Sequence, residues 1–151
     1  MEMAFVHTSI LKTLGYECYD NVSNWINSHQ TKEGGFGVGK SDITQTCYAV
    51  ESLNMIDPSL IHYEDNIIDF VNTCTAGGVY VYKPQSYPPY VETVYSGVRI
   101  NHILGNVVEY DKILKFVENL QNPDGGFRRS PYIGISELEY TYKAIYILKK
   151  I

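Results

Sequence analysis

Apolar residues recur along this chain at the spacing of amphipathic helices. In two stretches they stand at positions i, i+4 and i+7, which places their side chains on one face of a helix. These residues are Ile43, Cys47 and Val50 in the first stretch and Leu138, Tyr142 and Ile145 in the second. Asp42 with Gln45, and Ser136 with Glu139, precede them at the spacing of a capping box. The two pairs predict where these helices begin.

Similar patterns predict five further helices. Four of them cover residues 3–14, 20–29, 62–74 and 110–120. The fifth begins at Pro88 and Pro89, because proline is tolerated in the first turn of a helix. The chain therefore consists of half a helical hairpin followed by three whole hairpins. The chain is expected to be all-helical. Residues 78–82, Gly-Val-Tyr-Val-Tyr, alternate as a strand does, so this is where a local departure from helix would occur first.

A glycine turn, repeated near both ends of the chain, separates paired helices. Gln30 and Gln121 each stand four residues before a Gly-Gly pair, and an aromatic residue closes each copy. The copies end in Gly34, Gly35 and Phe36, and in Gly125, Gly126 and Phe127. A degenerate copy contains Gly77 and Gly78. Self-similarity of this kind is typical of stacked helical repeats.

The Gly-Gly pairs are interpreted as turns with positive φ between helices. Phosphate-binding loops are the alternative, but no G-x-G-x-x-G or G-x-x-x-x-G-K-[ST] context surrounds the pairs. Gln30 and Gln121 are expected to be structural, because one amide can serve an orphan N–H and an orphan C=O together. We expect each to tie its turn to a neighbouring helix end.

Segments 30–36 and 121–127, Gln-Thr-Lys-Glu-Gly-Gly-Phe and Gln-Asn-Pro-Asp-Gly-Gly-Phe, resemble the repeat of protein prenyltransferase β-subunits and squalene cyclases. A helix beginning near a threonine follows each one. The resemblance covers nearly the whole chain and implies a single all-α repeat domain over residues 1–151. That family forms an α/α toroid, whose alternating inner and outer helices enclose an aromatic-lined cavity for an isoprenoid chain. About six hairpins complete such a ring, so about three and a half make a partial toroid.

A partial toroid leaves two end faces that no neighbouring repeat covers, and such faces normally expose apolar surface. The last predicted helix is apolar over a wide sector, formed by Tyr140, Ile145, Ile147, Leu148 and Ile151. We therefore expect a partner that completes the toroid. It is a second copy of this chain in a homo-oligomer, a partner subunit, or the rest of a larger protein that contains this segment.

The resemblance also indicates where the family's zinc ligands would stand. Gln45 occupies the position of the histidine, and Glu139 and Thr141 correspond to the Asp-x-Cys pair. Glutamine and threonine are not normal zinc ligands, so no metal and no other cofactor are expected. His7 precedes Thr8 in a similar context, but the apolar spacing behind it fits one residue out of phase.

Acidic catalytic motifs of the related terpene enzymes are missing. Neither the Asp-x-Asp-Asp run of protonating cyclases nor the D-D-x-x-D run of metal-ionising synthases occurs. Glu64, Asp65 and Asp69 are interpreted as a solvated helix face. If the protein is an enzyme, the resemblance implies a transferase acting on prenyl groups.

Basic residues mark a candidate substrate site. Arg128 and Arg129 follow the second glycine pair, at a turn that the resemblance puts on one rim of the toroid. A diphosphate would need such planar, always-charged donors. Arg99 and His102 share a helix face at i, i+3 and join this set, with Tyr142 as an aromatic lining residue. Solvated arginines are the alternative interpretation.

Two functions therefore stay open. The first is a prenyltransferase-like toroid protein that binds an isoprenoid diphosphate without the family's zinc and acid residues. The second is a non-catalytic helical-repeat module that serves as a scaffold for protein interaction.

The composition of the chain excludes several classes of binding partner. The chain has 12 basic and 17 acidic residues, and its net charge of −5 argues against binding to nucleic acid or an anionic membrane. No apolar run approaches the ~20 residues of a membrane span, and nothing after Met1 resembles a signal peptide, so a cytoplasmic protein is expected. Cys18, Cys47 and Cys74 never form a C-x-x-C pair, which argues against a disulfide framework.

Overall fold

The computed structural model describes residues 1–16 and 20–150, so two residues named above, Cys18 and Ile151, lie outside the described residues. The described part of the chain forms seven α-helices, one short 3-10 helix and a two-stranded hairpin. In chain order the elements are α1 (Glu2–Thr13), α2 (Asp20–Asn27), α3 (Ile43–Ile56), η1 (Pro58–Leu60), α4 (Glu64–Thr73), β1 (Thr75–Ala76), β2 (Val79–Tyr80), α5 (Val91–Ile103), α6 (Asp111–Glu118) and α7 (Leu138–Leu148). The all-α prediction is confirmed.

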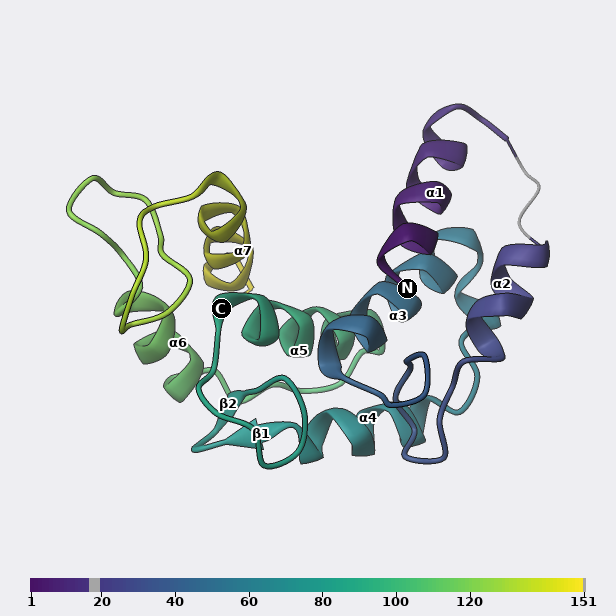
Figure 1. The fold of residues 1–151 in the computed structure, drawn as a ribbon, viewed down its shortest axis with the longest axis horizontal. Coiled ribbons are helices and arrows are strands. Elements are labelled where there is room, and N and C mark those ends of the chain that lie inside the picture. The colour runs from purple at the N-terminus through teal and green to yellow at the C-terminus, as the bar shows by residue number, and fades with distance from the viewer. Residues whose placement is uncertain (17–19, 151) are drawn as a thin grey trace.

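The helices form two layers that curve into an arc (Figure 1). The inner layer consists of α1, α3, α5 and α7, each of which packs against the next. The outer layer consists of α2, α4 and α6, which pack against α3, α5 and α7 respectively. The two inner helices at the ends of the arc, α1 and α7, stand apart from one another (Figure 1). The arc is a partial toroid of three and a half hairpins, as the sequence predicts.

One apolar core lies between the layers. Each outer helix buries a single stripe and keeps its other face polar, because its apolar residues recur at i, i+3 and i+4. These residues are Ile67, Phe70 and Val71 in α4, and Ile113, Phe116 and Val117 in α6. Burying one such side chain stabilises the fold by about 1.5–3 kcal/mol. Cys47 and Cys74 are free thiols that are buried in this core.

The two glycine turns share one hydrogen-bond pattern. In the first, Thr31 N donates to Gly35 O over 2.8 Å, and Gly34 N donates to Thr31 O over 3.0 Å. The second repeats both bonds, at 2.8 and 2.9 Å, from Asn122 to Gly126 and from Gly125 to Asn122. Gly34 has a φ of 95°, and a Cβ there would collide with the backbone oxygen of Asn66. Glycine at this position therefore brings the turn against α4.

A threonine, rather than the glutamine, ties each turn to the following inner helix. Thr46 Oγ1 accepts from Phe36 N at 3.0 Å, and Thr141 Oγ1 accepts from Phe127 N at the same distance. The Gln30 amide instead donates within its own turn, to Gly34 O at 3.2 Å. Gln121 does the same with Gly125 O at 3.3 Å, and its side chain is exposed. The prediction that these glutamines reach a neighbouring helix end is therefore wrong.

The two predicted helix starts have different outcomes. Asp42 is the N-cap of α3, and its carboxylate accepts from Gln45 N at 2.8 Å. Ser136 is not a cap: α7 begins at Leu138 behind Glu137, whose side chain makes no capping bond. The Ser136 hydroxyl donates instead to Asp124 Oδ1 at 2.7 Å. Because this hydroxyl is bonded to Asp124 in the glycine turn, it does not cap α7, and the capping-box prediction is wrong here.

The middle repeat contains the local strand structure that its alternating residues indicate. β1 and β2 pair antiparallel around Gly77 and Gly78, whose φ values of 61° and 83° suit a tight hairpin. Only two strands pair among the described residues, so the helical architecture is kept. Pro88 and Pro89 lie before the N-cap of α5 rather than in its first turn, which corrects the predicted helix start.

Candidate functional site

A cavity of about 530 Å³ opens at the N-terminal ends of the four inner helices. Each inner helix contributes to its wall: Glu2 from α1, Tyr48 from α3, Glu92 from α5 and Lys143 from α7. Loop residues complete it, among them Arg129. The cavity thus lies at the N-terminal end of the inner layer, and Tyr48, Tyr82 and Tyr90 are its aromatic lining residues.

The charged groups of this cavity are largely paired with one another. Arg129 Nε donates to Glu92 Oε1 at 2.7 Å, and its guanidinium lies 4.4 Å from the centre of the Tyr90 ring. Tyr82 donates its hydroxyl to Asp42 Oδ2 at 2.8 Å, and this hydrogen bond raises the pKa of Tyr82. The second carboxylate oxygen of Glu92, Oε2, is buried and has no hydrogen-bond partner among the described residues, so this cavity-lining carboxylate is only partly satisfied.

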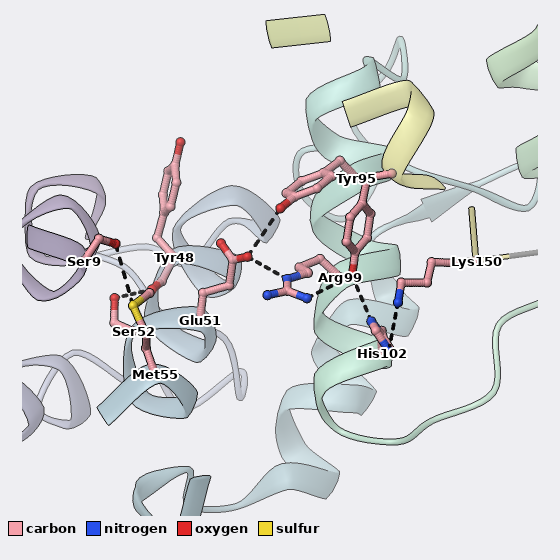
Figure 2. A network of polar contacts seen from close by, with 10 residues as sticks. Ser9, Tyr48, Glu51, Ser52, Met55, Tyr95, Arg99, His102 and Lys150 are labelled. Atoms are coloured by element: carbon pink, nitrogen blue, oxygen red, sulfur yellow. Dashed lines mark hydrogen bonds and ion pairs between the residues drawn. The ribbon is translucent and has the colours of Figure 1, made fainter. Parts of the chain in front are cut away.

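A second polar group joins the inner helices α3, α5 and α7 (Figure 2). It begins at Glu51 of α3, which is buried and accepts from Arg99 Nε at 2.6 Å. Tyr95, one turn before Arg99 on α5, donates its hydroxyl to the same carboxylate oxygen at 3.3 Å. Burial, and then the Glu51 charge, raise the pKa of Tyr95. Its phenol is therefore a stable donor.

The group continues onto α7 around the Tyr146 hydroxyl. Arg99 Nη1 donates to that hydroxyl at 2.9 Å, and His102 Nδ1 lies 2.8 Å from it. Lys150 Nζ lies 3.3 Å from the other ring nitrogen of His102, Nε2 (Figure 2). We name Arg99, His102, Tyr146 and Lys150 the basic cluster. It joins α5 to the C-terminal end of α7.

The hydrogen bonds assign the protons of the basic cluster. Lysine only donates, so Nε2 of His102 accepts and Nδ1 carries the proton of a neutral ring. Burial, Lys150 and Arg99 lower the pKa of His102, which agrees with a neutral ring. Tyr146 then accepts from both His102 and Arg99. Its own O–H is left to donate to an incoming acceptor.

The candidate substrate residues thus separate into three places. Arg99 and His102 come together, as their spacing predicts, whereas Arg129 lines the cavity. Arg128 faces the outer turn, where Nη2 donates to Asn119 O at 3.1 Å. Tyr142 is exposed on α7, with its ring 6.3 Å from that of Tyr95.

Sequence reasoning missed four members of these polar groups. Glu51, Tyr95, Tyr146 and Lys150 were not among the candidates. Helical spacing could have indicated three of them. At i, i+4 on a helix, Tyr95 lies beside Arg99, and Tyr146 lies beside both Tyr142 and Lys150. Glu51 had no such signal, because it comes from a different helix.

Positions that correspond to the family's zinc ligands do not form a zinc site. Gln45 and Glu139 both line the cavity, but Gln45 Nε2 donates to Asp42 at 2.6 Å and Glu139 pairs with Lys143 at 2.6 Å. Thr141 binds the Phe127 N–H. Within residues 1–16 and 20–150 no three His, Cys, Asp or Glu side chains are grouped to hold a metal ion. These residues do not fit zinc.

The sequence of the whole chain, residues 1–151, matches the family model of the prenyltransferase alpha-alpha toroid domain. The chain belongs to the prenyltransferase α/α toroid family. No curated protein matches its sequence significantly. Among solved structures it is similar to Candida albicans protein geranylgeranyltransferase-I complexed with GGPP, with a TM-score of 0.74 and 15% sequence identity. That likeness confirms the toroid fold.

The match to that structure covers 97% of this chain but only 48% of the other. This toroid-family chain therefore spans about half the length of the geranylgeranyltransferase chain. Within the described residues, its helices are too short or too polar for any of them to cross a bilayer.

Proposed function

We propose that this toroid-family protein binds an isoprenoid diphosphate along its inner helices, with the diphosphate at the basic cluster. The observation that carries the proposal is the grouping of Arg99, His102 and Lys150 around Tyr146. Arg99 and His102 contact its hydroxyl, and Lys150 Nζ lies 5.4 Å from the centre of its ring and 3.3 Å from His102 Nε2. A diphosphate requires several charged and hydrogen-bonding donors at one place. This cluster supplies them from two helices of the inner layer.

The aromatic residues near the basic cluster are suited to bind the prenyl chain, which is the apolar part of the ligand. The Tyr95 and Tyr146 rings lie 5.1 Å apart, and Tyr142 lies on the other side of Tyr95. Tyr48 is placed on α3 and contacts Phe5 of α1, with ring centres 5.5 Å apart. Such rings bury large apolar area and keep a polar tip, so they suit a prenyl chain that ends in a charged group.

Anion binding at the cluster should be coupled to protonation of His102. Burial, and then the neighbouring Lys150 and Arg99 cations, hold the pKa of His102 low in the free protein. A bound diphosphate offsets their charge, so the His102 pKa is higher in the complex than in the free protein. Binding therefore takes up a proton, so affinity increases as the pH falls from the His102 pKa of the complex toward the lower pKa of the free protein.

Calorimetric titration with geranylgeranyl and farnesyl diphosphate tests the proposal. Lys150→Gln should weaken binding about fivefold, since one partly exposed charge contact is lost. Lys149→Gln is the matched control, because Lys149 is adjacent, exposed and outside the cluster. His102→Gln should reduce the pH dependence of affinity. Geranylgeraniol, without the charge, and inorganic diphosphate, without the chain, should each bind more weakly.

Three results would contradict this proposal. They are an absence of binding heat with either prenyl diphosphate, equal losses in the two lysine variants, and a pH dependence unchanged by His102→Gln. The second candidate function, a non-catalytic interaction module, would then be favoured. Its specific support is that Gln45, Glu139 and Thr141 all use their polar side-chain atoms in contacts within the protein: Gln45 donates to Asp42, Glu139 accepts from Lys143, and Thr141 accepts from Phe127 N.

A further inference from the structure

One side of α7 presents a continuous apolar stripe to solvent. Its residues are between 37% and 88% exposed: Leu138, Tyr142, Ile145 and Leu148. They recur at i, i+4, i+7 and i+10, so they share one face of the helix. α7 is the last inner helix of the arc, and within the described chain no further helix covers this face (Figure 1).

The internal repeat shows what kind of surface this stripe is. The threonines Thr46, Thr93 and Thr141 occupy matching places in α3, α5 and α7. The residues one, four and seven positions later are Cys47, Val50 and Leu53 in α3, Val94, Gly97 and Ile100 in α5, and Tyr142, Ile145 and Leu148 in α7. In α3 and α5 all six are buried. Only the α7 set is exposed.

In α3 the stripe belongs to the apolar core, which also contains Val94, Val98 and Ile100 of the following inner helix, α5, and the two helices pack against each other. The stripe on α7 therefore occupies positions that are buried in the core in the other repeats. The described chain has no further inner helix to cover it.

The opposite end of the arc carries a matching apolar face. α1 packs against α3 through Phe5, Ser9 and Lys12, which contact Tyr48 and Met55. Its other side exposes Met3, Ile10 and Leu14, each more than half accessible. Part of this side, with Val22 and Trp25 of α2, lines a groove of about 390 Å³.

We propose that two copies of this chain close one ring, with α7 of each copy packed against the α1–α2 face of the other. α1 then takes the place of the inner helix that follows α7. Each copy offers both faces, so the same contact forms twice and the ring closes. The arc also matches 48% of the geranylgeranyltransferase chain, so two arcs have about the length of one such chain. This pairing does not depend on the proposed ligand.

Mass measurement in solution by light scattering tests the pairing without any ligand. The wild-type protein should have twice the chain mass of 17.2 kDa. Ile145→Lys on α7 and Ile10→Glu on α1 should each give a single chain, because each places a charge in both contacts of the ring. Val107→Lys is the control: Val107 is 88% exposed but lies in the loop after α5, away from both end faces.

Mixing the two variants distinguishes this arrangement from other pairings. In a mixed dimer one contact is wild type and the other joins the introduced lysine to the introduced glutamate as opposite charges. Equimolar Ile145→Lys and Ile10→Glu should therefore regain the dimer mass. Circular dichroism checks that each variant is folded. A wild-type monomer, a dimer that survives Ile10→Glu, or masses that grow beyond two chains would each overturn the closed ring.

Discussion

Thr46→Val tests the joint between the glycine turn and the inner helix. Thr46 is fully buried, and its hydroxyl accepts from Phe36 N at 3.0 Å while donating to Asp42 O at 2.7 Å. Valine has nearly the same shape but no hydroxyl. The substitution therefore removes two hydrogen bonds and leaves little cavity.

The two lost bonds should have unequal costs. Asp42 O keeps a partner, because Thr46 N donates to it at 3.0 Å. Phe36 N loses its acceptor inside the core, where Phe36 has no exposed surface. An unsatisfied buried donor costs about 1–3 kcal/mol, so we expect the free energy of unfolding to fall by about 2 kcal/mol. At this chain length the melting temperature should fall by about 4–8 °C.

Urea unfolding followed by circular dichroism measures the loss. The midpoint should fall while the slope stays unchanged, since the surface exposed on unfolding is the same. Thr44→Val is the matched control on the same helix, because the Thr44 hydroxyl makes no hydrogen bond to the described residues. A Thr46→Val midpoint at the wild-type value, or an equal fall in Thr44→Val, would refute the role of the hydroxyl.

Three further predictions concern other parts of the chain. Gly34→Ala should destabilise the fold more than Gly125→Ala, since both glycines have positive φ but only Gly34 faces a backbone atom; equal melting temperatures would argue against that contact. Burial raises the pKa of Tyr80 to about 12. The unfolding free energy should therefore fall between about pH 10 and 12, and less steeply in Tyr80→Phe. Elemental analysis of protein prepared with zinc should find no stoichiometric metal; one zinc per chain, lost in His7→Ala, would contradict this.

Features that depend on local chemistry could be predicted from the sequence. The glycine pairs indicate turns because few other residues adopt positive φ, and Asp42 caps α3 because its carboxylate reaches an N–H three residues away. Ser136 has equivalent spacing and fails, because Asp124 lies within 2.7 Å of its hydroxyl in the folded turn. Sequence spacing alone does not show that competitor.

The candidate site was less predictable for the same reason. Arg99 and His102 are neighbours on one helix, so their proximity follows from helical periodicity. Glu51 and Tyr146 reach Arg99 only through the packing of three inner helices, over separations of 48 and 47 residues. Arg128 and Arg129 are adjacent in sequence but serve different contacts, with Asn119 O and with Glu92.

The repeat itself separates the residues that build the toroid from those that give it a function. Three positions after the matching threonine stand Ala49, Ser96 and Ala144, all small and all buried, because inner helices pack closely there. Two positions farther along, the repeats carry glutamate, valine and tyrosine, at Glu51, Val98 and Tyr146.

A stack of identical units would have no reason to vary at that position, and a fold alone does not specify an activity. Glu51 and Tyr146 hold opposite ends of the Arg99 guanidinium. The difference between repeats thus fixes that cation on the inner wall. Tyr146→Phe keeps the ring and its packing but removes the hydroxyl that Arg99 and His102 contact. Ligand affinity should therefore respond to this change more than the dimer mass does.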